Sequence, residues 1–376
     1  MTKRIIIAVA AIALMAGSAA ISGQALAGHV DPSHGQGGGS NNVREYWIQA
    51  DDVRWDYAPS GMNLMAGREF EGGELVFVGP GDGLIGRVYK KAIYRLYTDG
   101  WKKRIRRGPR EEHLGILGPV IRAEVGDTII VHFRNNTRNK TLSVHPHGVF
   151  YDKSSEGAPY SDDTNEKADD FVSPRGGTHT YIWGVPERAG PGPSDPSSIA
   201  WEYHSHTNET ADTNAGLVGM ITVTRKGMAL PDGRPIDVDR EFFTMFAVLD
   251  ENVSLYIDEN IRRFGGDPGN PDFEESNLMH GMNGLLWGNN TGYAMYVGEH
   301  VRWYVLSMGT EVDLHTPHWH GVTLLHNGNR IDVTEVLPAA IKTLDFRPDN
   351  PGIWMYHCHV NDHLDAGMMT RFEILN

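Results

Sequence analysis

Short segments rich in apolar residues, separated by turn-forming residues, run along most of the chain. Segments 127–134 and 300–307 are rich in β-branched and aromatic residues and are bounded by Gly, Asn and Asp. Such segments predict strands. No long stretch keeps a helical period, and the 44 glycines and 20 prolines are spread along the chain, as in sandwiches with many turns. We therefore predict an all-β fold.

Two segments of the chain occur twice, in the same order. Residues 145–149 (His-Pro-His-Gly-Val) resemble 318–322 (His-Trp-His-Gly-Val), and residues 201–206 (Trp-Glu-Tyr-His-Ser-His) resemble 354–359 (Trp-Met-Tyr-His-Cys-His). Such a repeat predicts two similar domains. We expect domain 1 at 43–225, a Gly- and Pro-containing linker at 226–239, and domain 2 at 240–376.

The N-terminal 27 residues have the pattern of a secretory signal. Lys3 and Arg4 precede an apolar run, and residues 25–27 (Ala-Leu-Ala) form a small-residue cleavage site. The run is too short to span a bilayer. We expect export to the periplasm or the extracellular space, with a flexible Gly/Ser-rich arm at 28–42.

The charge and the cysteine content narrow the function. The formal net charge is −14, which disfavours nucleic acid as a partner. Cys358 is the only cysteine, so an internal disulfide is excluded. An unpaired cysteine in an exported protein needs a reason, and binding a metal as a thiolate is a good one.

The surroundings of Cys358 predict a blue-copper site. On a strand, residues two apart share a face, so Cys358 faces one way and the flanking His357 and His359 face the other. A blue-copper site needs two His, a Cys thiolate and a weak axial thioether. We predict that these are His315, Cys358, His363 and Met368.

Four H-x-H pairs predict a second centre. Each pair directs two imidazoles to one face of a strand, and eight imidazoles suit a cluster of several coppers better than a single ion. Domain 1 has Ser205 in place of the cysteine, so it keeps cluster histidines without a blue-copper site. The pairs are His145/His147, His204/His206, His318/His320 and His357/His359.

These motifs, H-x-H-G, H-x-H, H-x-x-H-x-H and H-C-H-x3-H-x4-M, resemble those of the multicopper oxidases, and most of all the ceruloplasmin and hephaestin group. The resemblance covers residues 43–376 and implies two cupredoxin-like Greek-key β-sandwiches with four coppers per protomer. Type 1 copper would take His315, Cys358, His363 and Met368. Type 2 copper would take His145 and His318. The type 3 pair would take His147, His204, His206, His320, His357 and His359.

The resemblance also implies partners. The six-domain relatives look like three two-domain units fused in a ring, so this unit would close as a homotrimer with each cluster between domain 1 of one subunit and domain 2 of the next. Electrons from a small reductant would pass from Cys358 to His357 and His359 and reduce dioxygen. Asp152 is a possible proton relay.

The electron donor stays open at this point. By resemblance, Glu275, His280 and Asp362 match the positions that bind ferrous iron beside the type 1 copper, which favours a metallo-oxidase for Fe(II), Cu(I) or Mn(II). The alternatives are a laccase-like oxidase of phenols and aromatic amines, and a copper-binding or electron-transfer protein without oxidase activity. Copper nitrite reductase lacks a type 3 pair and fits less well.

Overall fold

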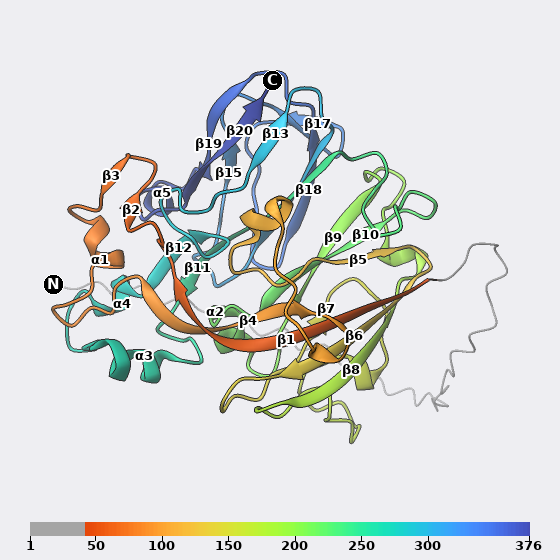
Figure 1. The fold of residues 1–376 in the computed structure, drawn as a ribbon, viewed down its shortest axis with the longest axis horizontal. Coiled ribbons are helices and arrows are strands. Elements are labelled where there is room, and N and C mark those ends of the chain that lie inside the picture. Colours follow the sequence, from red (N-terminus) through yellow and green to blue (C-terminus); the bar gives the residue numbers. More distant parts are fainter. Residues whose placement is uncertain (1–41) are drawn as a thin grey trace, which may run out of the picture. The chain divides into compact units, whose positions relative to one another are not determined.

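The segment predicted to be domain 1, residues 43–225, contains two four-stranded sheets in the computed structural model, which describes residues 42–376 (Figure 1). The expected signal segment and nearly all of the arm lie outside the described residues. The sheet orders are β4-β1-β6-β8 and β5-β10-β9-β7. The strands are β1 Val43–Asp56, β4 Val88–Tyr97, β5 Ile121–Glu124, β6 Thr128–Asn135, β7 His145–Pro146, β8 Gly177–Gly184, β9 Ser198–His204 and β10 Val218–Thr224.

Domain 2 has a six-stranded sheet, β12-β11-β14-β18-β16-β17, and a four-stranded sheet, β13-β20-β19-β15. Its strands are β11 Arg240–Asp250, β12 Leu278–Met282, β13 Ala294–Tyr296, β14 Val301–Ser307, β15 Pro317–Trp319, β16 Leu324–His326, β17 Asn329–Ile331, β18 Ile341–Phe346, β19 Gly352–Cys358 and β20 Met369–Leu375. The expected all-β fold is confirmed, and β6 and β14 confirm the two strands predicted from the sequence.

The remaining elements are short. They are the strands β2 Met62–Asn63 and β3 Arg68–Glu69, the helices α1 Glu74–Val78, α2 Glu209–Asn214, α3 Ile257–Phe264, α4 Phe273–Ser276 and α5 Asn361–Asp365, and the 3-10 turns η1 Asp99–Trp101, η2 Pro109–Leu114, η3 Lys153–Ser155 and η4 Glu187–Ala189. Within residues 42–376, no helix has the length and apolar character needed to cross a bilayer.

The two domains repeat one strand arrangement. In each, a four-stranded sheet joins a parallel pair to an antiparallel pair: β10 lies between β5 and β9, and β20 lies between β13 and β19. The H-x-H strands then pair in the same register, because His145 lies opposite His204 and His318 lies opposite His357. The internal repeat of the sequence therefore corresponds to an equivalent placement of histidines.

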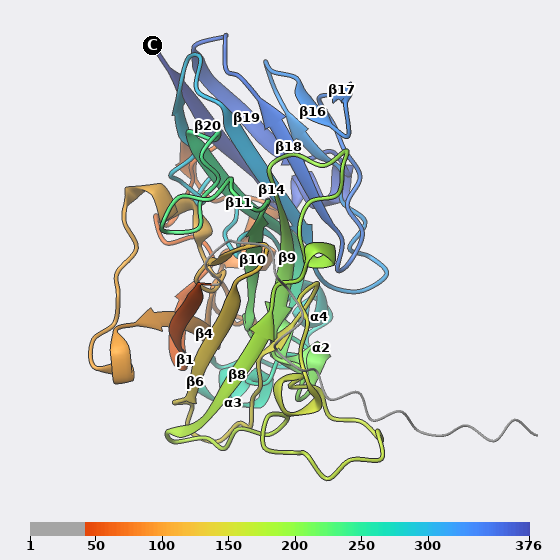
Figure 2. The same cartoon turned by 90° about the vertical axis from the view of Figure 1, so that its right-hand side faces the viewer.

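A shared core joins the domains into one compact unit, residues 41–376. Buried apolar residues of both domains, among them Ile116 and Phe243, belong to one cluster. Lys91 of β4 and Glu251 form a fully buried ion pair across the junction. In Figure 2, β16 to β20 of domain 2 lie in the upper part of the view, and β1, β4, β6 and β8 of domain 1 lie in the lower part. The histidines are therefore carried by one compact unit that contains both domains.

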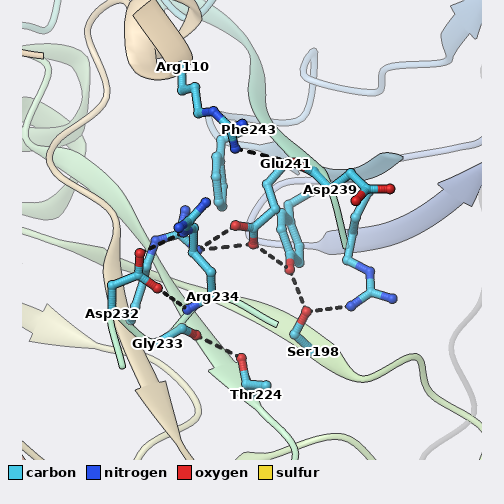
Figure 3. Close-up of polar contacts among 12 residues, drawn as sticks. Arg110, Ser198, Thr224, Asp232, Gly233, Arg234, Asp239, Glu241 and Phe243 are labelled. Carbon is cyan, nitrogen blue, oxygen red and sulfur yellow. Dashed lines mark hydrogen bonds and ion pairs between the residues drawn. The ribbon is translucent and has the colours of Figure 1, made fainter. Parts of the chain in front are cut away.

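Polar contacts at the junction add to this core (Figure 3). Glu241 of β11 accepts two hydrogen bonds from Arg122 of β5, at 3.0 and 2.8 Å, and one from the Tyr304 hydroxyl, at 3.1 Å. Ser198 of β9 meets the same hydroxyl at 2.6 Å. Each domain thus satisfies buried polar groups of the other.

Candidate metal centres

The first candidate centre lies where β19 ends, at Cys358. His315, just before β15, and His363 of α5 approach the thiol, and all three side chains are buried. The Cys358 Sγ lies 3.8 Å from His315 Nδ1 and 3.7 Å from His363 Nδ1, and the two Nδ1 atoms are 3.1 Å apart. Ligand atoms about 2.0–2.3 Å from one metal ion lie about 3–4 Å from each other. The three groups fit one copper.

Backbone hydrogen bonds hold this centre in place. The amide of Met368 donates to the His363 carbonyl at 2.9 Å, and the amide of Cys358 donates to the Met368 carbonyl at 3.0 Å. These bonds fix Met368, which is fully buried, beside the other residues. The Asp313 carboxylate lies 3.1 Å from His315 Nε2 and orients that ring.

Burial tunes the protonation of these groups. It raises the pKa of the Cys358 thiol, and it lowers the pKa of His363. A neutral imidazole is the form that binds a metal, whereas the thiol must lose its proton as the metal binds. Binding of a metal ion at this centre would therefore release the thiol proton of Cys358.

The second candidate centre consists of histidines of domain 2. His357 Nε2 lies 3.2 Å from His318 Nδ1 and 3.1 Å from His320 Nε2, and the ring of His359 lies 5.3 Å from that of His318. Burial lowers the pKa of His357 to about 4, which keeps the imidazole neutral. A hollow of about 520 Å³ lies against His318 and His320.

Domain 1 holds an equivalent third group. The Nε2 atoms of His147 and His204 are 3.2 Å apart, and the ring of His145 lies 5.1 Å from that of His206. Burial lowers the pKa of His204 to about 3 and that of His147 to about 4. These imidazoles also stay neutral and available to a metal.

Steric constraints explain why each H-x-H-G motif ends in glycine. Gly148 and Gly321 adopt positive φ angles of 74° and 72°. A Cβ on Gly148 would lie 2.1 Å from the ring of Trp201, and one on Gly321 would lie 2.5 Å from the ring of Trp354. Glycine therefore lets the chain turn tightly after each histidine pair, against a tryptophan of the neighbouring strand.

The histidines of domain 1 and domain 2 form two separate groups. Each group is connected internally by ring contacts and short N–N distances. No hydrogen bond or ring contact within residues 42–376 joins one group to the other. In the described part of the chain, the eight histidines therefore form two separate groups, one in each domain.

The structure adds a carboxylate that the sequence analysis missed. Glu202 of β9 lies on the same face as His204, and its Oε1 is 3.4 Å from His147 Nε2. Burial, with a smaller contribution from the charge of Glu209, raises the pKa of Glu202 to about 8. The signal was present in the repeat, where Glu202 takes the place of the apolar Met355.

The other expected site residues differ in their placement. The ring of His280 lies 5.3 Å from that of His363, and the negative charge of Asp362 acts on His280. Glu275 is exposed on α4, and no hydrogen bond among residues 42–376 joins it to His280 or Asp362. Asp152 is exposed, without a hydrogen bond from its side chain to a described histidine.

Two family profiles, both described as multicopper oxidase, match the chain. One covers residues 114–227, in domain 1, and the other covers residues 265–376, in domain 2. Together they span the three candidate centres, so the match includes every H-x-H pair and the cysteine.

Curated relatives are similar along most of the chain. Ferroxidase HEPHL1 of Mus musculus is 42% identical over 345 residues, which are 89% of this chain and 29% of the relative. Hephaestin of Homo sapiens is 42% identical over 348 residues, which are 89% of this chain and 29% of hephaestin. Ceruloplasmin of Mus musculus is 42% identical over 344 residues, which are 89% of this chain and 32% of ceruloplasmin. The chain thus spans about a third of the length of these relatives or less.

Solved structures share the fold at low sequence identity. One, titled crystal structure of multicopper oxidase, has a TM-score of 0.57 at 20% identity and covers 88% of this chain and 89% of its own. Another, titled multicopper oxidase mgLAC, has a TM-score of 0.57 at 19% identity, with 88% and 86% covered.

Proposed function

The chain belongs to the multicopper oxidase family, and from this premise we propose that it couples one-electron oxidation of a donor to four-electron reduction of dioxygen to water. One observation carries the proposal. Cys358 lies in the first centre, and the adjacent His357 lies in the second, so two ligand groups are joined by a few covalent bonds.

The donor set fits copper. Two imidazoles and a thiolate, with Met368 beside them, match the preference of a type 1 site, and the all-histidine groups match type 2 and type 3 coppers. Bound copper would supply one-electron transfer at the first centre and dioxygen reduction at the cluster. Cys358 and its two neighbours would connect these centres through the backbone of β19.

We infer that a second copy of this chain completes each cluster. We call each group of four histidines, one in domain 1 and one in domain 2, a half-site. Each half-site offers too few histidines for three coppers, and the hollow beside His318 and His320 leaves room for the half-site of a neighbour. A head-to-tail contact of this kind closes into a ring, and we expect three copies. A fully active monomer in a sizing experiment would contradict this arrangement.

Ferrous iron is the donor that we favour. The relatives include proteins named ferroxidase, and here His280 and Asp362 lie beside His363 of the first centre. A carboxylate binds an oxidised, more highly charged metal ion more strongly, which favours loss of the electron. Donation next to a type 1 ligand would need no long-range electron transfer.

Oxygen uptake by the copper-loaded protein tests the function. Fe(II), Cu(I), Mn(II) and a phenol would be compared as donors, with Fe(II) expected to be oxidised fastest. Asp362→Asn should lower Fe(II) oxidation and leave phenol turnover unchanged. Asp365→Asn, a substitution of an exposed carboxylate on the same helix, is the matched control. Unchanged Fe(II) oxidation in Asp362→Asn, with dominant phenol turnover, would favour a laccase-like oxidase.

A further inference from the structure

Glu202 is a buried carboxyl group whose side chain forms no hydrogen bond with the described residues. Its side chain is 1% exposed, and neither carboxylate oxygen has a hydrogen-bond partner in the described part of the chain. Buried carboxylates are otherwise paired, hydrogen-bonded or bound to a metal, because burying one alone is costly. The position therefore needs an explanation that the protein groups around it do not supply.

The neighbours of Glu202 are two metal-ligating side chains. Its Oε1 lies 3.4 Å from His147 Nε2, which lies 3.2 Å from His204 Nε2. Three ligand atoms bound tetrahedrally to one ion at about 2.0–2.2 Å lie about 3.3–3.6 Å apart. The observed spacing therefore suits one ion held by all three side chains, and the three lie within 4.8 Å of one another.

Resting on the proposed function, we propose that Glu202 is a carboxylate ligand of the cluster metal held by His147 and His204. Domain 1 then offers three protein ligands to one ion before a neighbouring subunit contributes any. The oxygen ligand adds negative charge to this half-site and favours a divalent copper over Cu(I).

Domain 2 provides an internal comparison for this proposal. The His147 amide donates to the Glu202 carbonyl at 2.9 Å, and the His320 amide donates to the Met355 carbonyl at 3.0 Å. Glu202 and Met355 therefore occupy equivalent positions, and only domain 1 places a carboxylate there. The two half-sites are chemically unequal, and metal loading should begin in domain 1.

Glu209 is a second carboxylate near a cluster histidine, and it serves as a comparison for Glu202. Its Oε2 lies 3.3 Å from His206 Nε2, a distance similar to that between Glu202 and His147, but its side chain is 53% exposed. Solvent satisfies an exposed carboxylate, so Glu209 has no need of a metal. Glu209→Gln is the matched control for Glu202→Gln and for Glu202→Met, which installs the residue type found in domain 2.

The test measures copper retained per chain during dialysis of the loaded full-length protein against a chelator, by elemental analysis. Glu202→Met and Glu202→Gln should lose one cluster copper per chain at least about tenfold faster than wild type and Glu209→Gln. The blue absorption of the type 1 site should stay unchanged in all four proteins. Retention equal to wild type in both Glu202 variants would overturn the proposal.

Thermal unfolding of the metal-free proteins tests whether Glu202 has only a structural role. Metal-free Glu202→Met should unfold at a higher temperature than wild type, because it no longer buries an unpartnered carboxyl. A lower unfolding temperature together with wild-type copper retention would overturn the proposal. Failure of the proposed function would show differently, as wild-type protein that holds copper through Glu202 but consumes no oxygen with any donor.

Discussion

The proposed blue-copper position of domain 2 and the equivalent position in domain 1 have the same backbone hydrogen bonds. Cys358 donates from its amide to the Met368 carbonyl, and Ser205 donates in the same way to Leu217. The amide of Met368 bonds to His363, and that of Leu217 bonds to Asp212. His315 and Val336 exchange two backbone hydrogen bonds, as do Leu142 and Val172. The equivalent pairs are His315/Leu142, Cys358/Ser205, His363/Asp212 and Met368/Leu217.

The side chains in this frame decide what it does. In domain 1, the Ser205 hydroxyl donates to Asp212 Oδ2 at 2.6 Å and accepts from the Ser143 amide at 3.1 Å, and Leu142 and Leu217 are both buried. In domain 2, the Thr316 amide likewise donates to Cys358 Sγ, at 3.5 Å, but the side chains beside the sulfur are two histidines, with His315 Nδ1 at 3.8 Å and His363 Nδ1 at 3.7 Å. The same backbone arrangement thus positions four side chains in each domain, and whether they could bind a metal depends on their identity.

The largest effect on blue absorption and oxygen uptake should come from replacing Cys358 of domain 2 with serine, the residue at the equivalent position of domain 1. Cys358→Ser removes the thiolate, so the blue absorption should vanish and oxygen uptake should fall at least about a hundredfold. Ser205→Ala, the corresponding change in domain 1, should keep the blue absorption. Retained blue colour in Cys358→Ser would contradict the assignment of the type 1 site.

The reverse exchange should have an intermediate effect. Combining Leu142→His, Ser205→Cys, Asp212→His and Leu217→Met places the complete donor set in the frame of domain 1. We expect the blue absorption per chain to rise about twofold, since the backbone geometry is already present. A folded variant that gains no blue absorption would show that the frame alone does not position a second site.

The smallest effect concerns Ser205 and Asp212, the hydrogen-bonded pair at the domain 1 positions that match the proposed ligands Cys358 and His363. Burial raises the pKa of Asp212 to about 6, above the value of about 3.9 for an unfolded chain. The native state therefore binds more protons than the unfolded state between about pH 4 and 6, and the stability contribution of Asp212 falls by about 3 kcal/mol as the pH rises through this window. The Asp212→Asn variant has no carboxyl group to titrate at this position, so its free energy of unfolding should not include this decrease.

Urea unfolding at several pH values measures this difference. The free energy of unfolding of Asp212→Asn, relative to wild type, should increase between pH 4 and 7. Parallel pH profiles of the two proteins would show that Asp212 titrates in the native state as it does in the unfolded chain.

Much of the fold and of the candidate centres followed from the sequence, for a physical reason. Strand alternation places His357 and Cys358 on opposite faces. The strands β6 and β14 could be predicted because their apolar residues form short segments with turn residues at both ends. The partners of Lys91 depend on packing between distant strands, which local patterns do not encode. Glu202 was missed because its burial arises from that packing, although its register with His204 was visible.

The central claim is that each cluster is built from domain 1 of one chain and domain 2 of the next. Two variants test it: one with His204→Ala and His206→Ala, the other with His318→Ala and His320→Ala. Each alone should consume no oxygen. Co-expressed in equal amounts, they should recover about a quarter of wild-type oxygen uptake, since that share of the interfaces in random trimers pairs an intact domain 1 with an intact domain 2. No recovery in mixed trimers would contradict the claim and place the cluster within a single chain.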